Sequence, residues 1–274
     1  MNIEQNLICP ICKNPLSKQD SSLKCERGHC FDFAKSGYVN LLNPGKKNNA
    51  KAGDSKEMIR ARSLFFETGC YSQIRDTLSS IVRALSPRVV VDAGCGEGYY
   101  TSSIASDCEA VVYGFDMSKH GTEHASKHDR LCGIKNSFYA VANIFDMPLR
   151  DGCTDVIVNA FAPVAIEDFS RVLRHGGHLI VCASGEHHLE GLKRQLYTQV
   201  YLNEPSEHSY EGFELVERKT LKYRTEVTGA DAIWALFQMT PYYHRTSLED
   251  KAKLEGIEKL ETEVEVDFFI LRKI

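Results

Sequence analysis

The chain has 274 residues, of which 43% are hydrophobic and 26% charged; this composition belongs to folded proteins and excludes a disordered, collagen-like or coiled-coil chain. The length allows one large domain plus a small one. No apolar run approaches the roughly 18 residues of a membrane-spanning helix, and the first residues lack the basic and apolar segments of a signal peptide. Ten cysteines without a disulfide-scaffold spacing favour a reducing compartment. We expect a cytoplasmic protein that does not enter a membrane.

Charge is distributed unevenly along the chain, although the net charge is only −4. Residues 1–63 carry 11 Lys and Arg against 6 Asp and Glu, whereas the remainder carries 22 against 31. A basic segment joined to an acidic body suits contact with a polyanion such as RNA, although solvated lysines without a partner would give the same count.

A metal-binding pattern lies near the amino terminus. Cys9 and Cys12 form one pair and Cys25 and His29 a second, in the spacing C-x2-C-x12-C-x3-H. Two tight turns of this kind present four ligands to one tetrahedral zinc ion. Because four protein ligands leave no open position for water, such an ion would be structural and not catalytic. Cys30 follows His29 directly and is an alternative fourth ligand.

The pattern sets the expected domain boundaries. We expect residues 1–42 to form a zinc-binding domain that docks RNA and is too small to fold without its metal, so that removal of zinc should unfold it and spare the rest. Residues 43–54 lack apolar periodicity and predict a basic linker. Its lysines are placed either to meet phosphates or to remain solvated: Lys46, Lys47 and Lys51.

Residues 55–274 predict an α/β domain. A helix is expected from Ser55, where apolar residues recur at helical intervals until Gly69. Residues 89–98 read as a buried strand that breaks into a glycine-rich turn, and the next helix opens at residue 99. A second strand at 110–115 ends in Asp116, where a carboxylate can accept both hydroxyls of a ribose.

Strands and helices continue to alternate along the chain. Further strands are predicted at 137–142, 155–161 and 178–183, with a helix at 166–173. This order implies a doubly wound parallel sheet that binds its ligand at the carboxyl ends of the strands.

Two motifs in this domain indicate the ligand. The string D-x-G-C-G-x-G at 92–98 resembles the first motif of class I S-adenosylmethionine-dependent methyltransferases, and L-x-x-G-G-x-L at 173–179 resembles their turn before the fifth strand. A nicotinamide enzyme would more often show G-x-G-x-x-G, and the third glycine of that spacing is missing here. The expected fold is therefore a class I, Rossmann-like methyltransferase sheet with a small zinc-binding domain, and the expected methyl donor is S-adenosylmethionine.

Motifs from both ends of the chain occur together in one narrower family. They include C-P-x-C at 9–12, G-H-x-F-D at 28–32, D-A-G-C-G-E-G-Y-Y at 92–100 and Q-M-T-P at 238–241. With these motifs the whole chain resembles the bacterial 23S rRNA guanine-N1 methyltransferases of the RlmA type.

The resemblance implies specific ligands. Zinc would be held by Cys9, Cys12, Cys25 and His29, that is, by three thiolates and one imidazole. Asn143 stands where many class I enzymes place an aspartate that accepts from the adenine amine, and an amide oxygen can accept the same bond without charge assistance. The full set expected to bind the donor is Tyr71, Asp92, Gly94, Gly96, Glu97, Asp116, Asn143 and His188.

Methylation of guanine N1 needs an in-line acceptor and a base that takes the N1 proton, and the sequence does not single out that base. Asn159 and Phe161 resemble the position where nucleobase methyltransferases place an amide and an aromatic ring, although a strand end with a core phenylalanine explains them equally well. Tyr242 and His244 belong to a late aromatic loop that suits an unstacked base. These four residues are the catalytic candidates.

The resemblance further implies a target guanine in a stem-loop of domain II of 23S rRNA and, in some members, a contribution to macrolide-class resistance. Which of two neighbouring guanines is methylated stays open, and we also consider a homodimer. Two alternatives are a small-molecule methyltransferase whose zinc serves stability alone, and a non-catalytic RNA-binding protein. Three histidines at four-residue intervals suit a solvated helix face better than a metal site: His120, His124 and His128.

Overall fold

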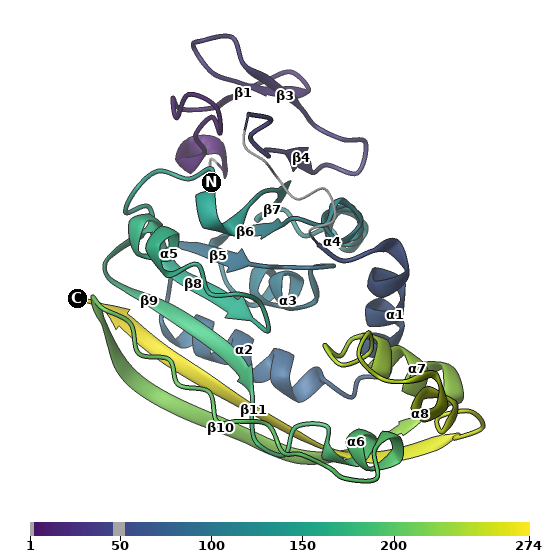
Figure 1. Cartoon of the computed structure of the whole chain (residues 1–274). Coiled ribbons are helices and arrows are strands. Elements are labelled where there is room, and N and C mark those ends of the chain that lie inside the picture. Colours follow the sequence, from purple (N-terminus) through teal and green to yellow (C-terminus); the bar gives the residue numbers. More distant parts are fainter. Residues whose placement is uncertain (1–2, 46–52) are drawn as a thin grey trace.

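A large mixed sheet organises the chain (Figure 1), which is seen here in a computed structural model that describes residues 3–45 and 53–274. Lys46, Lys47 and Lys51 therefore lie outside the described residues. Eight strands of the described part form the sheet, in the order β10 (Phe213–Thr228), β11 (Lys259–Lys273), β9 (Leu173–Ser184), β8 (Thr154–Ala160), β5 (Val89–Ala93), β6 (Val111–Asp116), β7 (Ser137–Val141) and β4 (Val39–Asn40).

The central strands are parallel, as the alternating pattern predicts. Strands β9, β8, β5, β6, β7 and β4 pair in parallel, whereas β11 runs antiparallel to both β9 and β10. All five residues of β5 are buried, because a parallel sheet is covered on both faces. The class I methyltransferase fold is thereby confirmed. The long pair β10–β11 was not among the predicted elements.

Helices cover the sheet unequally. One face carries α2 (Ser72–Ala84), α3 (Tyr99–Asp107) and α4 (Lys119–Cys132), and the other carries α5 (Ile166–Val172). Helix α1 (Lys56–Glu67) packs against α7 (Ala230–Gln238) and lies beside α4, whereas α6 (Glu190–Leu196) and α8 (Leu248–Ala252) lie on the far side of α7 (Figure 1). The three histidines of α4 are exposed, in agreement with a solvated face. None of the described helices is long and apolar enough to cross a membrane.

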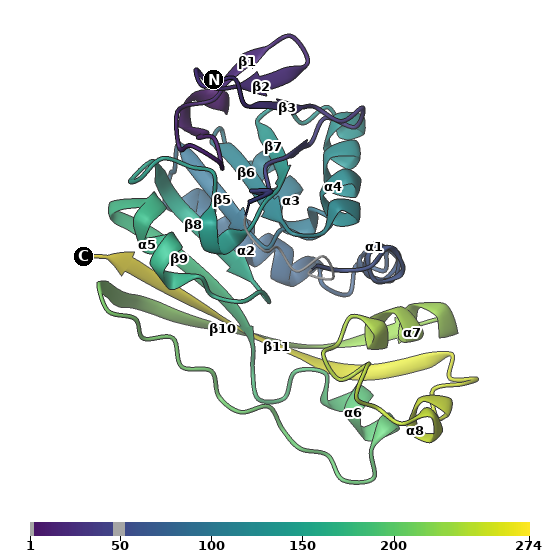
Figure 2. The same ribbon diagram turned by 45° about the horizontal axis from the view of Figure 1, so that its top comes forward.

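The amino-terminal segment, residues 3–41, is called the zinc module below. It contains η1 (Ile3–Asn6) and a small antiparallel sheet of β1 (Ser17–Gln19), β2 (Ser22–Lys24) and β3 (Cys30–Asp32). Figures 1 and 2 show it at the β6–β7 end of the molecule, away from α7 and α8. Its last strand, β4, already belongs to the large sheet and pairs with β7. The chain therefore enters the methyltransferase sheet before residue 42.

One hydrophobic core joins the zinc module to the sheet. Leu7, Leu23 and Val39 are fully buried and belong to the same apolar cluster as Phe138 of β7 and Leu149. The described connection from β7 to β8 contains η2 (Ile144–Asp146) and no α-helix. Because both faces of a parallel sheet need cover, the zinc module takes the place that a crossover helix would occupy.

Candidate active site and metal centre

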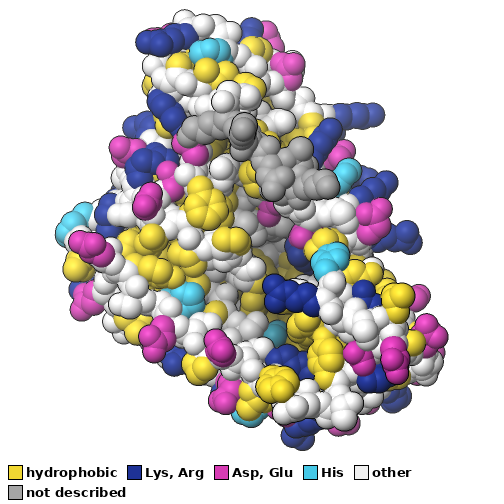
Figure 3. Space-filling view, in the orientation of Figure 1, with side chains coloured by type: hydrophobic (Ala, Val, Ile, Leu, Met, Phe, Trp, Pro, Cys, Tyr) yellow, Lys and Arg dark blue, Asp and Glu magenta, His cyan; other side chains and the backbone are white. Residues whose placement is uncertain are grey.

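A cavity of about 940 Å³ opens where the parallel strands end. It is lined by the turns that follow β5, β6, β7 and β8, and by residues of α1 and of the loop after α7. In Figure 3 the face toward the reader is hollowed between the sheet and the α7–α8 region, and apolar and basic side chains border the hollow. A site at the carboxyl edge of the strands agrees with the expectation for a doubly wound fold.

The glycine turn after β5 brings the backbone close to the cavity. Gly94 has φ +93°, and a Cβ there would lie 2.6 Å from Cβ of Ala162. Gly96 has φ +54°, and a Cβ there would lie 2.9 Å from a guanidinium nitrogen of Arg62. Side chains at either position would fill the space beside the turn, so that the glycines keep it open for a ligand.

Asp116 closes β6 at the cavity. Its two carboxylate oxygens accept from the backbone amides of Gly96 (2.9 Å) and Ser118 (2.6 Å). Burial raises the pKa of Asp116, while these two amides oppose the rise. Each oxygen retains lone-pair capacity toward the cavity, as an acceptor for ribose hydroxyls requires.

Asp92 lies beneath the glycine turn and is not among the residues that line the cavity. Its Oδ2 accepts from the hydroxyl of Thr101 at 2.5 Å, whereas Oδ1 is buried with no hydrogen-bond partner among the described residues. Burial raises the pKa of Asp92 to about 7. Its observed contact supports the start of α3 and does not reach the cavity.

Arg62 of α1 forms the centre of a charged cluster at the cavity. Its NH1 lies 2.6 Å from Oδ2 of Asp54 and 3.4 Å from Oε2 of Glu97. Burial raises the pKa of Glu97 to about 7, and the Arg62 charge opposes that rise. Asp54 in turn accepts, through its backbone oxygen, from the hydroxyl of Ser118 (2.8 Å). The start of α1 is thereby fixed to the two turns expected to hold the donor.

Tyr71 and His188 form a buried pair in the cavity. Their Oη and Nε2 atoms lie 2.9 Å apart, and the backbone amide of Glu265 donates to Nδ1 of His188 at 3.2 Å. Because Nδ1 accepts, the proton of the neutral ring lies on Nε2 and is donated to Tyr71. Burial lowers the pKa of His188 to about 4. The Tyr71 hydroxyl therefore keeps its own proton to donate to a ligand.

Asn143 lines the cavity after β7, and its side chain accepts from the backbone amide of Phe145 at 3.0 Å. This bond fixes the turn and occupies one of the two lone pairs of the amide oxygen, so that the other remains for the adenine amine. Phe145 itself also lines the cavity and is 58% exposed.

The two candidates after β8 lie in different environments. Asn159 is fully buried and does not line the cavity, and its amide nitrogen donates to the backbone oxygens of Ala93 (3.0 Å) and Pro163 (3.1 Å). These contacts make Asn159 a support for the turn and not a group that reaches a substrate. Phe161 lines the cavity, is 43% exposed and has φ +54°. A phenylalanine in this left-handed conformation is strained, and such strain gathers at functional sites.

Tyr242 and His244 both line the cavity from the loop after α7. The Tyr242 hydroxyl is buried and has no hydrogen-bond partner among the described residues. Tyr243 between them instead packs against Trp234 and Phe237. Tyr242 and His244 of the late aromatic loop thus face the cavity, whereas Tyr243 packs against α7.

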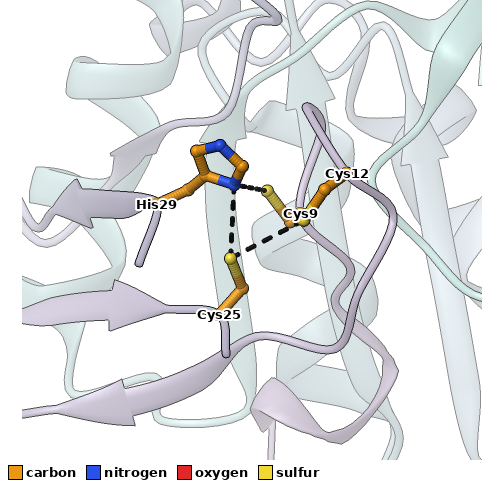
Figure 4. A group of neighbouring side chains, drawn as sticks. All are labelled: Cys9, Cys12, Cys25 and His29. Atoms are coloured by element: carbon orange, nitrogen blue, oxygen red, sulfur yellow. Dashed lines mark hydrogen bonds between the residues drawn. The ribbon is translucent and has the colours of Figure 1, made fainter. Parts of the chain in front are cut away.

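Four ligand atoms gather in the zinc module (Figure 4). The donor atoms of Cys9, Cys12, Cys25 and His29 all lie within 4.8 Å of one another. Nδ1 of His29 lies 3.4 Å from Sγ of Cys9 and of Cys25, and the thiols of Cys12 and Cys25 lie 3.7 Å apart. These separations match the edges, about 3.8 Å, of a tetrahedron around zinc bound at about 2.3 Å. The exposed Cys30 thiol instead lies 3.7 Å from Asp32.

Comparisons with known proteins agree with the metal-binding segment and with the methyltransferase sheet. Residues 7–51 match the zinc-ribbon family described as RlmA, N-terminal, and residues 86–234 match a family described as a methyltransferase domain. The chain is 36% identical over 200 residues to a 23S rRNA (guanine(748)-N(1))-methyltransferase of Streptomyces fradiae, covering 70% of this chain and 68% of that one. The chain belongs to the RlmA-type family of 23S rRNA (guanine-N1)-methyltransferases.

Two further similarities concern a second relative and the fold. YxjB of Bacillus subtilis, named as a putative 23S rRNA (guanine-N(1)-)-methyltransferase, is 29% identical over 285 residues, covering 96% of this chain and 95% of its own. The solved structure of the YcgJ protein of Bacillus subtilis covers 72% of this chain and 98% of its own, with a TM-score of 0.50 and 14% identity; it shows the fold alone.

This RlmA-type methyltransferase uses S-adenosylmethionine as its methyl donor and holds a structural zinc ion. The geometry of the cavity fits this donor: the glycine turn is open, Asp116 lines the cavity, and the Tyr71 hydroxyl has a proton to donate. Arg62 and Asp54 line the same cavity, and the sequence analysis did not include them among the candidate site residues. Helical periodicity assigned Arg62 to α1, and no local signal indicates that α1 reaches the glycine turn.

Proposed function

We propose that this methyltransferase transfers a methyl group from S-adenosylmethionine to N1 of a guanine in a stem-loop of domain II of 23S rRNA. The continuity of the cavity carries the proposal. One space runs from the glycine turn at Gly94–Glu97 to the exposed ring of Phe161 and on to His244. An exposed aromatic ring beside the donor is what a flat, unstacked base requires.

Residues on both sides of the reacting atoms have distinct proposed roles. Phe161 would stack on the guanine, and Tyr71, Glu97, Asp116 and His188 would hold the donor. Zinc on Cys9, Cys12, Cys25 and His29 would maintain the module that docks the RNA. With donor and base both fixed, methyl transfer depends mainly on alignment.

The proton of guanine N1 requires an acceptor, for which we propose His244. His188 is unsuited because Nδ1 accepts from the Glu265 amide while Nε2 pairs with Tyr71. Glu97 pairs with Arg62. His244 lines the cavity and makes no hydrogen bond among the described residues, so its ring nitrogens are available to a substrate.

Reverse transcription across 23S rRNA tests the proposal, because a methyl group on guanine N1 blocks base pairing. We expect one stop at a domain II guanine in cells that contain the protein, and loss of that stop when its gene is deleted. Complementation with His244→Gln should restore little of the stop, whereas His175→Gln, the same change at an exposed position of β9 that does not line the cavity, should restore it fully.

The outcome also separates the alternatives. A stop elsewhere in the rRNA, or a methyl group on ribose or carbon, would contradict the assignment. A protein that binds donor but leaves rRNA unchanged would indicate a small-molecule substrate. Macrolide-class resistance follows from the proposed position only if deletion also lowers the inhibitory concentration of such drugs. An enzyme with this substrate would act in the cytoplasm.

A further inference from the structure

The zinc module contacts the rim of the cavity through one short segment. Residues 143–150, called the rim segment below, connect β7 to β8. Asn143, Ile144 and Phe145, at the start of the segment, line the cavity. Its end pairs with the zinc module, since the amide of Ile8 donates to the backbone oxygen of Pro148 (2.9 Å) and Leu7 forms an antiparallel bridge with Leu149.

Side chains strengthen this pairing on both sides. The Arg150 guanidinium donates to Oδ1 of Asn6 at 2.7 Å, and the Arg150 amide donates to the Asn6 backbone oxygen at 3.0 Å. Nζ of Lys13 lies 2.7 Å from Oδ1 of Asp146. Lys13 belongs to the metal-binding turn, because its amide donates to the backbone oxygen of Cys9 at 2.8 Å. The turn that presents Cys9 to the metal therefore also presents Lys13 to the rim segment.

The contact between the zinc module and the rim segment is buried, and α5 supports the rim segment from the opposite side. Leu7, Cys9, Met147 and Leu149 are all fully buried in one apolar cluster. On the opposite side, Arg171 of α5 donates to the backbone oxygens of Met147 (2.9 Å) and Leu149 (2.7 Å). The rim segment is thus held between α5 and the zinc module, and it contains the short 3-10 helix η2 but no α-helix of its own.

We propose that the zinc module positions the rim segment, so that the metal sets the affinity of the cavity for the methyl donor as well as the fold of the module. Without its ion the turn at Cys9–Lys13 loses its constraint, and the pairing of residues 6–8 with 148–150 loses its support. Asn143 to Phe145 would then be fixed from one side alone. This coupling goes beyond RNA docking and does not depend on which RNA is methylated.

Hydrogen exchange and donor binding, measured on the full-length zinc protein before and after chelation, test the coupling. We expect exchange to rise in residues 6–25 and in the rim segment, while β5 stays protected. Affinity for S-adenosylhomocysteine, measured calorimetrically, should fall about 5–150-fold, the usual range for two coupled sites. Re-addition of zinc should restore both. An unfolded zinc module with unchanged exchange in the rim segment and unchanged donor affinity would overturn the proposal.

A matched pair of variants tests the contact with the metal still bound. Arg150→Met removes the side-chain bond to Asn6, whereas Arg174→Met removes a comparable partly exposed arginine whose partner, Asp155, lies at the amino-terminal end of β8. At equal zinc content, only Arg150→Met should weaken donor binding and raise exchange in the rim segment. If chelation also unfolds β5, this pair decides: equal donor affinity of the two variants would then refute the coupling.

Discussion

Buried charge is the residue-scale feature that most distinguishes this site. Asp92 precedes the glycine turn and Glu97 lies within it. Burial raises the pKa of each carboxyl to about 7. Glu97 has Arg62 as a counter-ion, whereas Asp92 accepts one hydrogen bond, from the Thr101 hydroxyl. The two carboxyls therefore affect the protein differently as pH changes.

Asp92 should make the protein less stable as pH rises. Its folded-state pKa of about 7 exceeds its ordinary value of 3.8, so that the folded state binds more protons and stability is lost between about pH 4 and pH 7. Asp92→Asn should remove this loss and raise the free energy of unfolding at pH 8 by roughly 2–4 kcal/mol. Urea unfolding at pH 5 and pH 8 measures the difference.

Asp155→Asn provides the control with the opposite sign. The bonds from Arg174 and from the amides of Arg88 and Val89 lower the pKa of Asp155, so that its contribution is present at neutral pH and lost in acid. The variant should be less stable than the parent at pH 7 and should approach it near pH 3. Parallel pH profiles for the parent protein and Asp92→Asn would contradict the assignment of a buried charge at Asp92.

At the scale of elements, the turn after β8 places its two candidate residues in different environments. Asn159 fastens this turn to the backbone of Ala93 and Pro163. Phe161 then projects into the cavity from a left-handed backbone conformation. The sequence identified both residues, but it did not separate the one that supports the turn from the one that reaches the cavity, because that division depends on which carbonyls surround each side chain.

Phe161→Gly should separate the effect of the strained backbone on stability from the effect of the aromatic ring on RNA binding. Glycine adopts the observed φ freely, so the unfolding free energy should stay equal or rise by about 1 kcal/mol. Loss of the ring should raise the KM for RNA about tenfold, since stacking on one base is worth about 1–3 kcal/mol. Donor affinity should change less than twofold. The measurements are thermal unfolding, steady-state methylation of a domain II transcript and calorimetry.

Phe161→Leu is the matched variant, because it keeps the apolar side chain and the strained backbone but removes the aromatic face. We expect it to resemble Phe161→Gly in KM and the parent protein in stability. Methylation by either variant at the parent rate under subsaturating RNA would show that Phe161 does not stack on the base.

At the scale of the whole molecule, the zinc module is a layer of the methyltransferase and not an attachment to it. The sequence predicted the parallel strands because each is a short apolar run between turns, and it predicted the metal ligands because their spacing is local. It could not predict that Leu7 pairs with Leu149, since contacts between distant segments leave no periodic signal. The same holds for Arg62 and for the β10–β11 pair, whose length depends on mutual pairing.

Removal of residues 1–42 should therefore damage the remaining domain. The truncated chain would lose edge strand β4 and expose the apolar side chains that pack against Leu7 and Leu23, and an apolar surface of this kind promotes association. We expect strong binding of a hydrophobic dye and aggregation in sedimentation experiments, compared with a monodisperse full-length protein. A truncated domain that is monodisperse and binds donor with parent affinity would show that the two parts are independent.

The pairing of Leu7 with Leu149 also has a consequence for synthesis. The zinc module emerges from the ribosome many residues before β7 and the rim segment, so its apolar side meets water until they follow. During this interval bound zinc is what holds the metal-binding turn in shape. A nascent chain that lacks zinc would expose this apolar surface for longer and would aggregate more readily with other unfolded chains. The zinc supply of the cell would thus limit how much enzyme reaches its folded state, in addition to setting the donor affinity of enzyme already made.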